Sequence, residues 1–300
     1  MSAETDRLVH WLVSGLELET SVFHVGQYCG AWRASTAGRS RASFHLILRG
    51  NCYLHLPQRE PVALQANDAV FLLRDIAHSL TPEANPGDAC VPKPMLPMKP
   101  VLTDGTSLAC GFFDFRGLLG ELLVGSFPEY LLLRADSAPL RAIAPLFEMI
   151  LAEAERDEET PSPLIERLTE LLFFYVIRDM AQSREVQAGL WAVARQPRFS
   201  SLVDRLLQEP ARDWSLEDMA QVANMSRTNF CRHFAEACGQ PPAQFLLSLR
   251  MGIAAQRLRQ GESVTRAAEH VGYQSPAAFT RAFKKIIGEQ PGAYQRSRRH

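Results

Sequence analysis

The chain has 300 residues, of which 46% are hydrophobic and 22% charged. This composition is typical of a globular protein, which excludes disordered, collagen-like and coiled-coil chains, and the length predicts about two domains. No stretch is apolar over the roughly 18 residues that a membrane-spanning helix needs, so we expect no membrane span. The N-terminus has acids before its apolar stretch, so we expect no signal peptide. Six scattered cysteines are typical of a reduced cytoplasmic protein.

The net charge of −1 conceals an asymmetry along the chain. Residues 198–300 contain 15 Lys and Arg against 9 Asp and Glu, whereas residues 1–197 contain 17 against 24. A basic third joined to an acidic remainder indicates a module for a polyanion attached to a module with another task. A solvated basic face is the simpler alternative, and charge alone does not exclude it.

The first part of the chain is predicted to be rich in strands. Residues 1–20 have the pattern of a short amphipathic helix, and from about 21 to 116 apolar residues alternate with polar ones. Gly50-Asn51 between two such runs predicts a hairpin, and Asn67-Asp68 predicts a turn. Several short strands at close spacing favour a small β-barrel or sandwich.

After residue 117 the apolar period becomes helical. Residues 139–155 and 163–182 read as two helices, and residues 183–198 suit a linker. The second helix has an unusually wide apolar stripe, made of Leu164, Leu168, Leu171, Leu172, Tyr175 and Val176. Such a stripe is either core or the seam of a dimer.

The basic third contains an internal repeat. Five residues recur in the same order 49 positions further on, namely Ser226, Arg232, Phe234, Gly239 and Pro242 as Ser275, Arg281, Phe283, Gly288 and Pro291. Before the turn, Ala220 matches Ala268 at an offset of 48, so the second copy has one extra turn residue.

Each copy predicts a helix-turn-helix, at about residues 214–238 and 263–287. A capped short helix, a tight turn and a second capped helix with two buried Phe residues leave a polar, basic outer face on that second helix. A helix of this kind fits the DNA major groove, where Arg and Asn can read base edges. One copy would be compatible with any helical hairpin, but two copies in the basic segment predict DNA binding. The candidate DNA-contacting residues are Ser226, Arg227, Thr228, Asn229, Arg232, Ser275, Pro276, Ala277, Thr280, Arg281, Lys284 and Lys285.

Residues 199–300 resemble the DNA-binding region of the AraC/XylS family of bacterial transcriptional regulators. The resemblance rests on WSLEDMA, MSRTNFCRHF, GQxP, AAEHVGYQS and FTRAFKKxxGEQPGAY. It implies seven helices, two helix-turn-helix motifs rigidly linked by a central helix, double-stranded promoter DNA and RNA polymerase as partners, and activation more often than repression.

Residues 5–190 are similar to the cupin-type N-terminal domain of one branch of that family. The similarity rests on FHLILRG (44–50), EPVALQANDAVFLL (60–73), AH (77–78) and LACGFFDF (108–115). It implies a sensor for an unknown small-molecule effector and a homodimer. The expected fold is therefore α+β, with a cupin-like β-barrel (1–116), a helical dimerisation segment (117–185), a linker (186–198) and an all-α double helix-turn-helix domain (199–300).

Candidate sensor residues are few, and each has a simpler explanation. His45, His55 and His78 could line an effector pocket, but the Glu and the His-x-His pair of metal-binding cupin enzymes are missing, so ordinary strand histidines are favoured. Cys90 and Cys110 are candidates for a redox switch, although buried packing is the commoner use of Cys. We therefore expect no enzyme, no metal and no cofactor; the alternative is a metal-binding cupin enzyme fused to a DNA-binding module.

Overall fold

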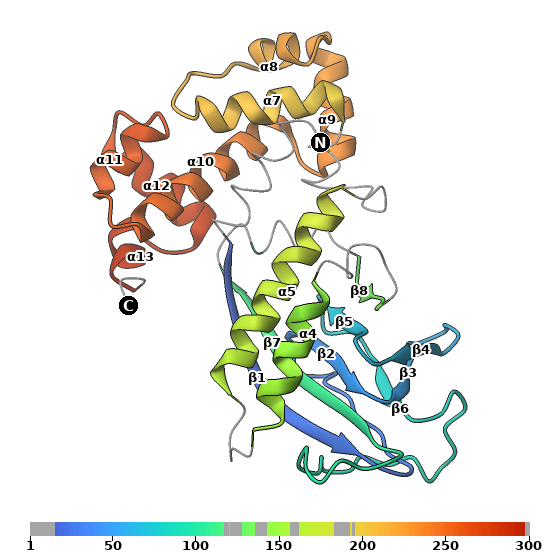
Figure 1. Ribbon diagram of the computed structural model, residues 1–300. Coiled ribbons are helices and arrows are strands. Elements are labelled where there is room, and N and C mark those ends of the chain that lie inside the picture. The colour runs from blue at the N-terminus through green and yellow to red at the C-terminus, as the bar shows by residue number, and fades with distance from the viewer. Residues whose placement is uncertain are drawn as a thin grey trace. The chain divides into compact units, whose positions relative to one another are not determined.

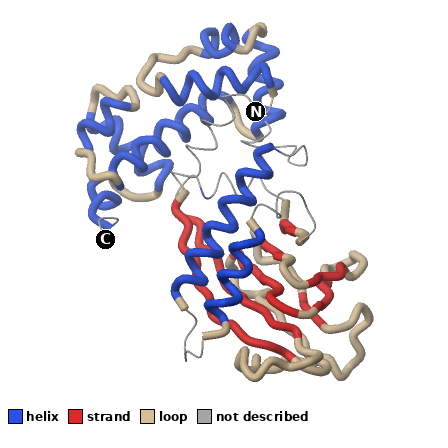
Figure 2. Tube along the Cα trace, viewed as in Figure 1, coloured by secondary structure: helices blue, strands red, loops and turns tan. Residues whose placement is uncertain are grey.

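The chain folds into a β-rich unit and a helical unit (Figures 1 and 2). The computed structural model describes residues 16–116, 120, 128–135, 143–156, 162–182, 193 and 196–297. The β-rich unit comprises Leu18–Asp114 and Phe127–Asp179, and the helical unit comprises the remainder, including Met180–His300. Most of the helix expected over residues 1–20 lies outside the described residues, and a strand begins at Glu17. No helix in the described ranges is both long and apolar enough to cross a membrane.

The β-rich unit contains two sheets. Its strands are β1 (Glu17–Tyr28), β2 (Ala42–Arg49), β3 (Asn51–His55), β4 (Val62–Gln65), β5 (Ala69–Leu72), β6 (Ser79–Thr81), β7 (Thr106–Arg116) and β8 (Tyr130–Leu133). The larger sheet has the order β1-β7-β2-β5-β8 and the smaller one β4-β3-β6. Among the described strands the two sheets do not close into one continuous barrel, so the barrel expectation is met only as a cupin-like pair of facing sheets.

The hairpin predicted at Gly50-Asn51 is wrong. β2 pairs with β5 and β7, whereas β3 pairs with β4 and β6, so the two strands belong to different sheets. Gly50 adopts a φ of +70°, and a Cβ there would lie 2.5 Å from the Gly105 carbonyl oxygen. A single glycine therefore turns the chain from one sheet into the other. The turn predicted at Asn67-Asp68 is confirmed, with Asn67 at a φ of +69°.

The larger sheet is buried on both faces, and this explains the long apolar run of β2. One face of this sheet carries Phe44, Phe71 and Phe113. Phe173 of α5 (Pro163–Gln182) packs on the last two of these rings at centroid distances of 5.5 and 4.8 Å. In Figure 1, α5 and α4 (Ala144–Ala154) run along this face. The opposite face meets the smaller sheet through an apolar core that includes Ile47, Val70, Leu54, Leu64 and Leu80.

The helical unit holds seven helices over residues 196–297, all of which the structure describes. They are α7 (Pro197–Gln208), α8 (Leu216–Val222), α9 (Arg227–Cys238), α10 (Pro242–Arg259), α11 (Val264–His270), α12 (Pro276–Ile287) and α13 (Pro291–Ser297). The pairs α8–α9 and α11–α12 are the two predicted helix-turn-helix motifs, and α10 joins them (Figure 1).

The two motifs repeat the same local bonds. Ser215 and Asp218 form the predicted capping box at α8, and Ser263 caps α11. The turn after each first helix closes with the same backbone bond, from Met225 N–H to Ala220 O and from Tyr273 N–H to Ala268 O, each 2.9 Å. The donors Met225 and Tyr273 are 48 residues apart, whereas the capping serines that follow them, Ser226 and Ser275, are 49 apart. The extra turn residue is therefore Gln274.

Aromatic rings hold each second helix in place. Phe230 and Phe234 of α9 pack against Phe199 of α7, and Phe234 also meets Phe245 of α10 at 5.3 Å. In the second motif Phe283 of α12 packs against Tyr294 of α13, at 5.5 Å. Each motif thus has a third helix behind it, which fixes its polar helix against an apolar support. The pattern of apolar residues along α12 predicts that Ile286 is buried with Phe279 and Phe283, but it is only half-buried.

Candidate nucleic-acid interface

The outer faces of α9 and α12 present the candidate DNA-contacting residues to solvent. Arg232 is the sixth residue of α9 and Arg281 the sixth residue of α12, and both are exposed. The other candidates are also exposed apart from Thr280, which is half-buried. The rings that anchor each helix lie on the opposite side, because Phe230, Phe234, Phe279 and Phe283 are fully buried. Equivalent positions in the two copies therefore present equivalent arginines.

The start of each exposed helix is suited to a phosphate. The hydroxyl of Ser226 accepts the backbone N–H of Asn229, and the hydroxyl of Ser275 accepts that of Ala278, each at 3.4 Å. Both hydroxyls use their oxygen as an acceptor in the cap, so each still has its O–H to donate. The positive end of the helix dipole lies at the same place, which favours an anion.

The charged residues of α9 differ in how far they are engaged within the protein. Arg227 forms an ion pair with Glu217 of α8 at 2.7 Å. Glu236 pairs with His233 at 3.3 Å, and Arg232 contacts only the ring of His233 among the described residues, at 3.4 Å. An intramolecular pair between Arg232 and Glu236, which would occupy the arginine, is therefore not formed.

The basic side chains of α12 point into solvent. The side chains of Arg281, Lys284 and Lys285 make no hydrogen bond or ion pair with any residue that the structure describes, and all three residues are exposed. Lys284 and Lys285 lie in the last turn of the helix, where the dipole also favours cations. Unpaired cations on an exposed helix provide the positive charge that DNA phosphates attract.

In the β-rich unit, two of the three candidate histidines come together. His45 lies on β2 opposite Cys110 of β7 in the strand register, and its Nδ1 is 3.1 Å from the Cys110 Sγ. Its Nε2 is 3.1 Å from the Nε2 of His78. The hydroxyl of Thr36 lies 3.1 Å from His78 and 2.8 Å from the hydroxyl of Ser43. All five side chains are buried and form one polar cluster beside the apolar core.

One assignment of protons satisfies the histidines of this cluster. His78 Nδ1 is 2.9 Å from the Ile76 carbonyl, so it carries the proton and its Nε2 accepts. His45 then donates from Nε2 to His78 and accepts the Cys110 S–H at Nδ1. This arrangement requires both histidines to be neutral. Burial, reinforced by His78, lowers the pKa of His45 to about 3, and burial also lowers the pKa of His78.

The remaining candidates of the β-rich unit lie elsewhere. His55 is outside the cluster because residues 51, 53 and 55 of β3 face away from the core, and its Nε2 bonds the Thr81 hydroxyl at 2.7 Å. Cys90 and Cys110 are both buried and both free. Burial raises the pKa of the Cys110 thiol, which disfavours the thiolate that oxidation requires. Thr36 and Ser43 were missed by sequence reasoning, although Ser43 precedes His45 by two and so shares its face.

Neutral buried histidines make the β-rich unit sensitive to acid. A histidine whose pKa is lowered on folding takes up a proton only in the unfolded state, so stability is lost as pH falls below the unfolded value of about 6.5. For His45 the loss at pH 5 is about 2 kcal/mol relative to pH 7.5. Urea unfolding of the full chain at both pH values should show this fall, and His45→Gln should reduce it by about 2 kcal/mol, leaving the part that His78 contributes. An equal fall in the variant would contradict the assignment.

No group of three or more His, Cys, Asp or Glu side chains is placed to hold a metal ion among the described residues. An open hollow of about 420 Å³ lies over β3 and β4, lined by Asn51, Tyr53, Gln65 and Arg134 among others. It is separate from the cluster of His45 and His78, whose polar atoms bond one another.

Comparison with protein families finds two matches in this chain. Residues 7–182 match the cupin family model, and residues 219–297 match a helix-turn-helix domain model. The first match covers the β-rich unit and the second covers α9 to α13 together with most of α8.

Curated relatives match across both units. An uncharacterized HTH-type transcriptional regulator of Haemophilus influenzae is 30% identical over 281 residues, which cover 90% of this chain and 92% of that protein. A Streptomyces lividans protein, whose name calls it an AraC-like transcription regulator, is 26% identical over 89% of this chain and 90% of its own length. The RCS-specific transcriptional activator RclR of Escherichia coli is 25% identical over 84% and 83%.

Proposed function

The chain belongs to the AraC-type transcriptional regulators with a cupin N-terminal domain, and from that premise we propose that it recognises promoter DNA through α9 and α12 together. The observation that carries this proposal is the repeated placement of Arg232 and Arg281. Each is the sixth residue of an exposed helix that is braced from behind by buried aromatic rings. Each helix would enter a major groove, and the two grooves would lie about one helical turn apart.

The residues divide by the part of DNA that they would contact. Arg232 and Arg281 are placed to read guanine, with Thr228, Asn229 and Ala277 acting on neighbouring bases. Ser226, Ser275, Thr280, Lys284 and Lys285 are placed for phosphates, which set position and affinity rather than sequence. Arg227 would have to leave Glu217 to reach DNA, and Pro276 serves the start of α12, where its missing N–H costs nothing.

The β-rich unit would act as the sensor for a small-molecule or redox signal. The cupin family match supports this role, and the buried polar cluster around His45 and His78 is a part of its interior with the chemistry to respond. An effector that entered there would replace the existing bonds between the two histidines. Cys90 and Cys110 stay candidates for a redox signal.

Dimerisation through α5 is the second part of the proposal. Leu164 and Leu171 lie seven residues apart on one face of this helix and are 53% and 44% exposed. Met149 of the neighbouring α4 is also exposed, at 52%. Large apolar side chains exposed on two neighbouring helices favour an association surface there. A second copy of the chain would cover it, and a dimer would bring four recognition helices to one promoter.

The remaining parts of the proposal follow from the family. The chain would act in the cytoplasm, where bacterial DNA lies, and would contact RNA polymerase from its bound position. Activation is the expected direction, because RclR is an activator. Its curated relatives are transcriptional regulators, and we propose no catalytic activity.

A salt titration tests the DNA contact. Of the five cations on the outer faces of α9 and α12, Lys284 and Lys285 are placed for phosphates, so the binding constant of one copy should fall with salt with a log–log slope of about −2 or steeper. Replacing Lys284 and Lys285 by Gln should reduce that slope by about 2 and weaken all sequences alike, by about tenfold. Electrophoretic mobility shifts of the full chain on genomic fragments would measure both.

Lys93→Gln with Lys99→Gln is the matched control, because both residues are exposed in the β-rich unit. This variant should keep the wild-type slope. A folded full-length protein that binds no DNA at low salt would overturn the proposal.

A further inference from the structure

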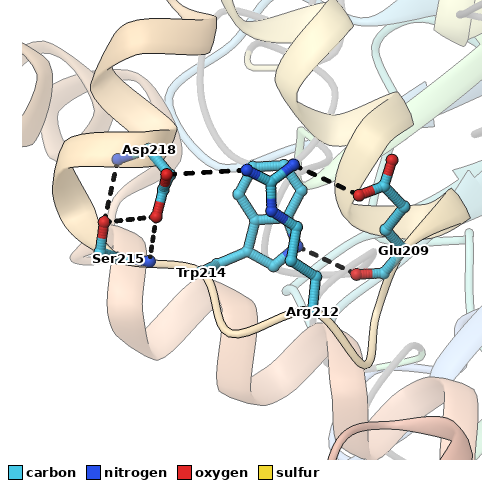
Figure 3. Close-up of polar contacts among 5 residues, drawn as sticks. All are labelled: Glu209, Arg212, Trp214, Ser215 and Asp218. Carbon is cyan, nitrogen blue, oxygen red and sulfur yellow. Dashed lines mark hydrogen bonds and ion pairs between the residues drawn. The ribbon is translucent and has the colours of Figure 1, made fainter.

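The loop between α7 and α8 is unusually well fixed for a surface connection. The indole N–H of Trp214 and the backbone N–H of Arg212 both donate to the Glu209 carbonyl, at 3.0 and 3.2 Å. Figure 3 shows the Arg212 guanidinium over the Trp214 ring, at 4.2 Å, and between the carboxylates of Glu209 and Asp218. Asp218 also belongs to the capping box of α8. The loop is therefore one rigid piece with the first helix-turn-helix.

Arg250 of the central helix α10 forms two hydrogen bonds with this loop. Its Nε donates to the Pro210 carbonyl at 2.8 Å and its Nη2 donates to the Arg212 carbonyl at 2.6 Å. Both acceptors are backbone atoms, so the two bonds hold the path of the chain itself. Burial lowers the pKa of Arg250, but an arginine stays protonated, and its two bonds are charge-assisted.

The second helix-turn-helix touches the same loop between these two carbonyls. Gly272, in the turn between α11 and α12, has a φ of +86°. A Cβ at this position would lie 2.7 Å from the carbonyl oxygen of Ala211 and 3.1 Å from its Cα. Only glycine allows the turn of the second motif to lie so close to the loop of the first.

The loop thus connects the two motifs by a route other than α10. The central helix α10 already packs on the first motif, through Phe245 and Phe234. A second attachment away from the axis of this helix further restricts the rotation of one motif against the other. We infer that Arg250 and Gly272 are positioning residues, which fix α9 and α12 relative to each other and so set the spacing between the two DNA half-sites that the protein accepts. This inference rests on the proposed function, because it presumes that both helices read DNA.

The preferred spacing of the two DNA half-sites is a sensitive readout of how firmly α9 and α12 are held relative to each other. One base pair more or less displaces the second half-site by about 3.4 Å and turns it by about a tenth of a helical turn. A rigid pair of helices cannot follow such a change, so the wild-type protein should prefer one spacing by about tenfold over its neighbours. A loosened pair should bind several spacings almost equally.

The experiment uses the full chain and a binding site selected from random DNA by the wild-type protein. Probes carry the two half-sites at the selected spacing and at one and two base pairs more or less. Arg250→Met keeps the apolar stem but loses both donors, and should reduce the spacing preference to about threefold or less. Arg250→Lys, which keeps the charge and can serve one carbonyl, should lie between. Gly272→Ala should also flatten the profile, through the backbone.

Arg205→Met is the matched control, since it removes an exposed arginine from α7 and should leave the profile unchanged. If Arg250 only stabilised the fold, Arg250→Met would weaken every spacing alike and keep the wild-type ratio, and that result would overturn the inference. Failure of the wild-type protein to select any DNA would refute the proposed function instead. Thermal melting of each variant identifies an unfolded protein, in which case Arg250→Lys and Gly272→Ala decide the question.

Discussion

The variants Arg232→Ala and Arg281→Ala should each lose one part of the preference for particular DNA bases, and the double variant should lose most of it. A bidentate arginine–guanine contact discriminates by about 1–3 kcal/mol, so each single variant should lose about 5- to 150-fold of its preference for the wild-type base. The two affected positions should lie about 10 base pairs apart, because the two helices would enter successive major grooves. Selection of binding sites from random DNA measures this directly.

The position of the two arginines supports this large effect. Arg281 makes no ion pair with the described residues, and Arg232 contacts only His233, so neither must abandon an acidic partner to reach a base. Lys284→Ala is the control, because a lysine that contacts phosphate should weaken all sequences alike and leave the selected motif unchanged. If both arginine variants recover the wild-type motif, these residues do not read bases.

Introducing charge on the exposed stripe of α5 should produce a monomer. Leu164→Asp with Leu171→Asp places two carboxylates where a second copy would pack, which opposes association. A site that carries two copies of the recognition sequence should then lose about 10²- to 10⁴-fold in affinity, because the second binding event is no longer intramolecular. Binding to a single copy should be unaffected. Sedimentation velocity and mobility shifts on both kinds of site would measure these changes.

The control for this experiment introduces the same charges elsewhere in the β-rich unit. Leu96 and Val101 are 47% and 54% exposed, so Leu96→Asp with Val101→Asp makes the same chemical change away from α5. This variant should stay dimeric. A wild-type protein that sediments as a monomer at micromolar concentration would contradict the dimer.

The structure also decides which leucines of α5 can be tested. Leu172 belongs to the apolar stripe seen in the sequence, but it is fully buried, and so is its neighbour Phe173, which packs on the sheet. A carboxylate at Leu172 would be buried without a partner and would unfold the domain rather than separate two copies. Leu168 is half-buried, so Leu164 and Leu171 alone give a clean test.

The helical unit was largely predictable because its signals are local. A capping serine acts on a backbone N–H three residues away, and Ser215, Ser226, Ser263 and Ser275 all do so in the structure. Buried phenylalanines one turn apart identify the supporting face of each second helix. The supporting rings were harder to foresee. Phe199 lies outside the repeat, and Tyr294, which stands 49 residues after Phe245, joins its core only through tertiary packing.

The β-rich unit was predicted less well because strand pairing is not local. Alternation of polar and apolar residues located most of the strands, but it did not say which strands pair. The hairpin at Gly50 failed for this reason. The meeting of His45 with Cys110 and His78 depends on β2, β7 and the segment just before β6, which are far apart in the chain.

By itself, the sequence determined the class of the protein, the repeat and the basic faces of its two recognition helices, since these depend on composition and on contacts within a few residues. Only the tertiary structure decided that Arg250 bonds the carbonyls of Pro210 and Arg212 while Gly272 lies against Ala211 between them. It also decided that Leu171 is exposed while Leu172 is buried. The contacts of Arg250 and Gly272 join residues tens of positions apart. The difference in burial between Leu171 and Leu172 arises because successive residues of a helix point in different directions around its axis. Both arise from the packing of whole elements, which no local pattern encodes.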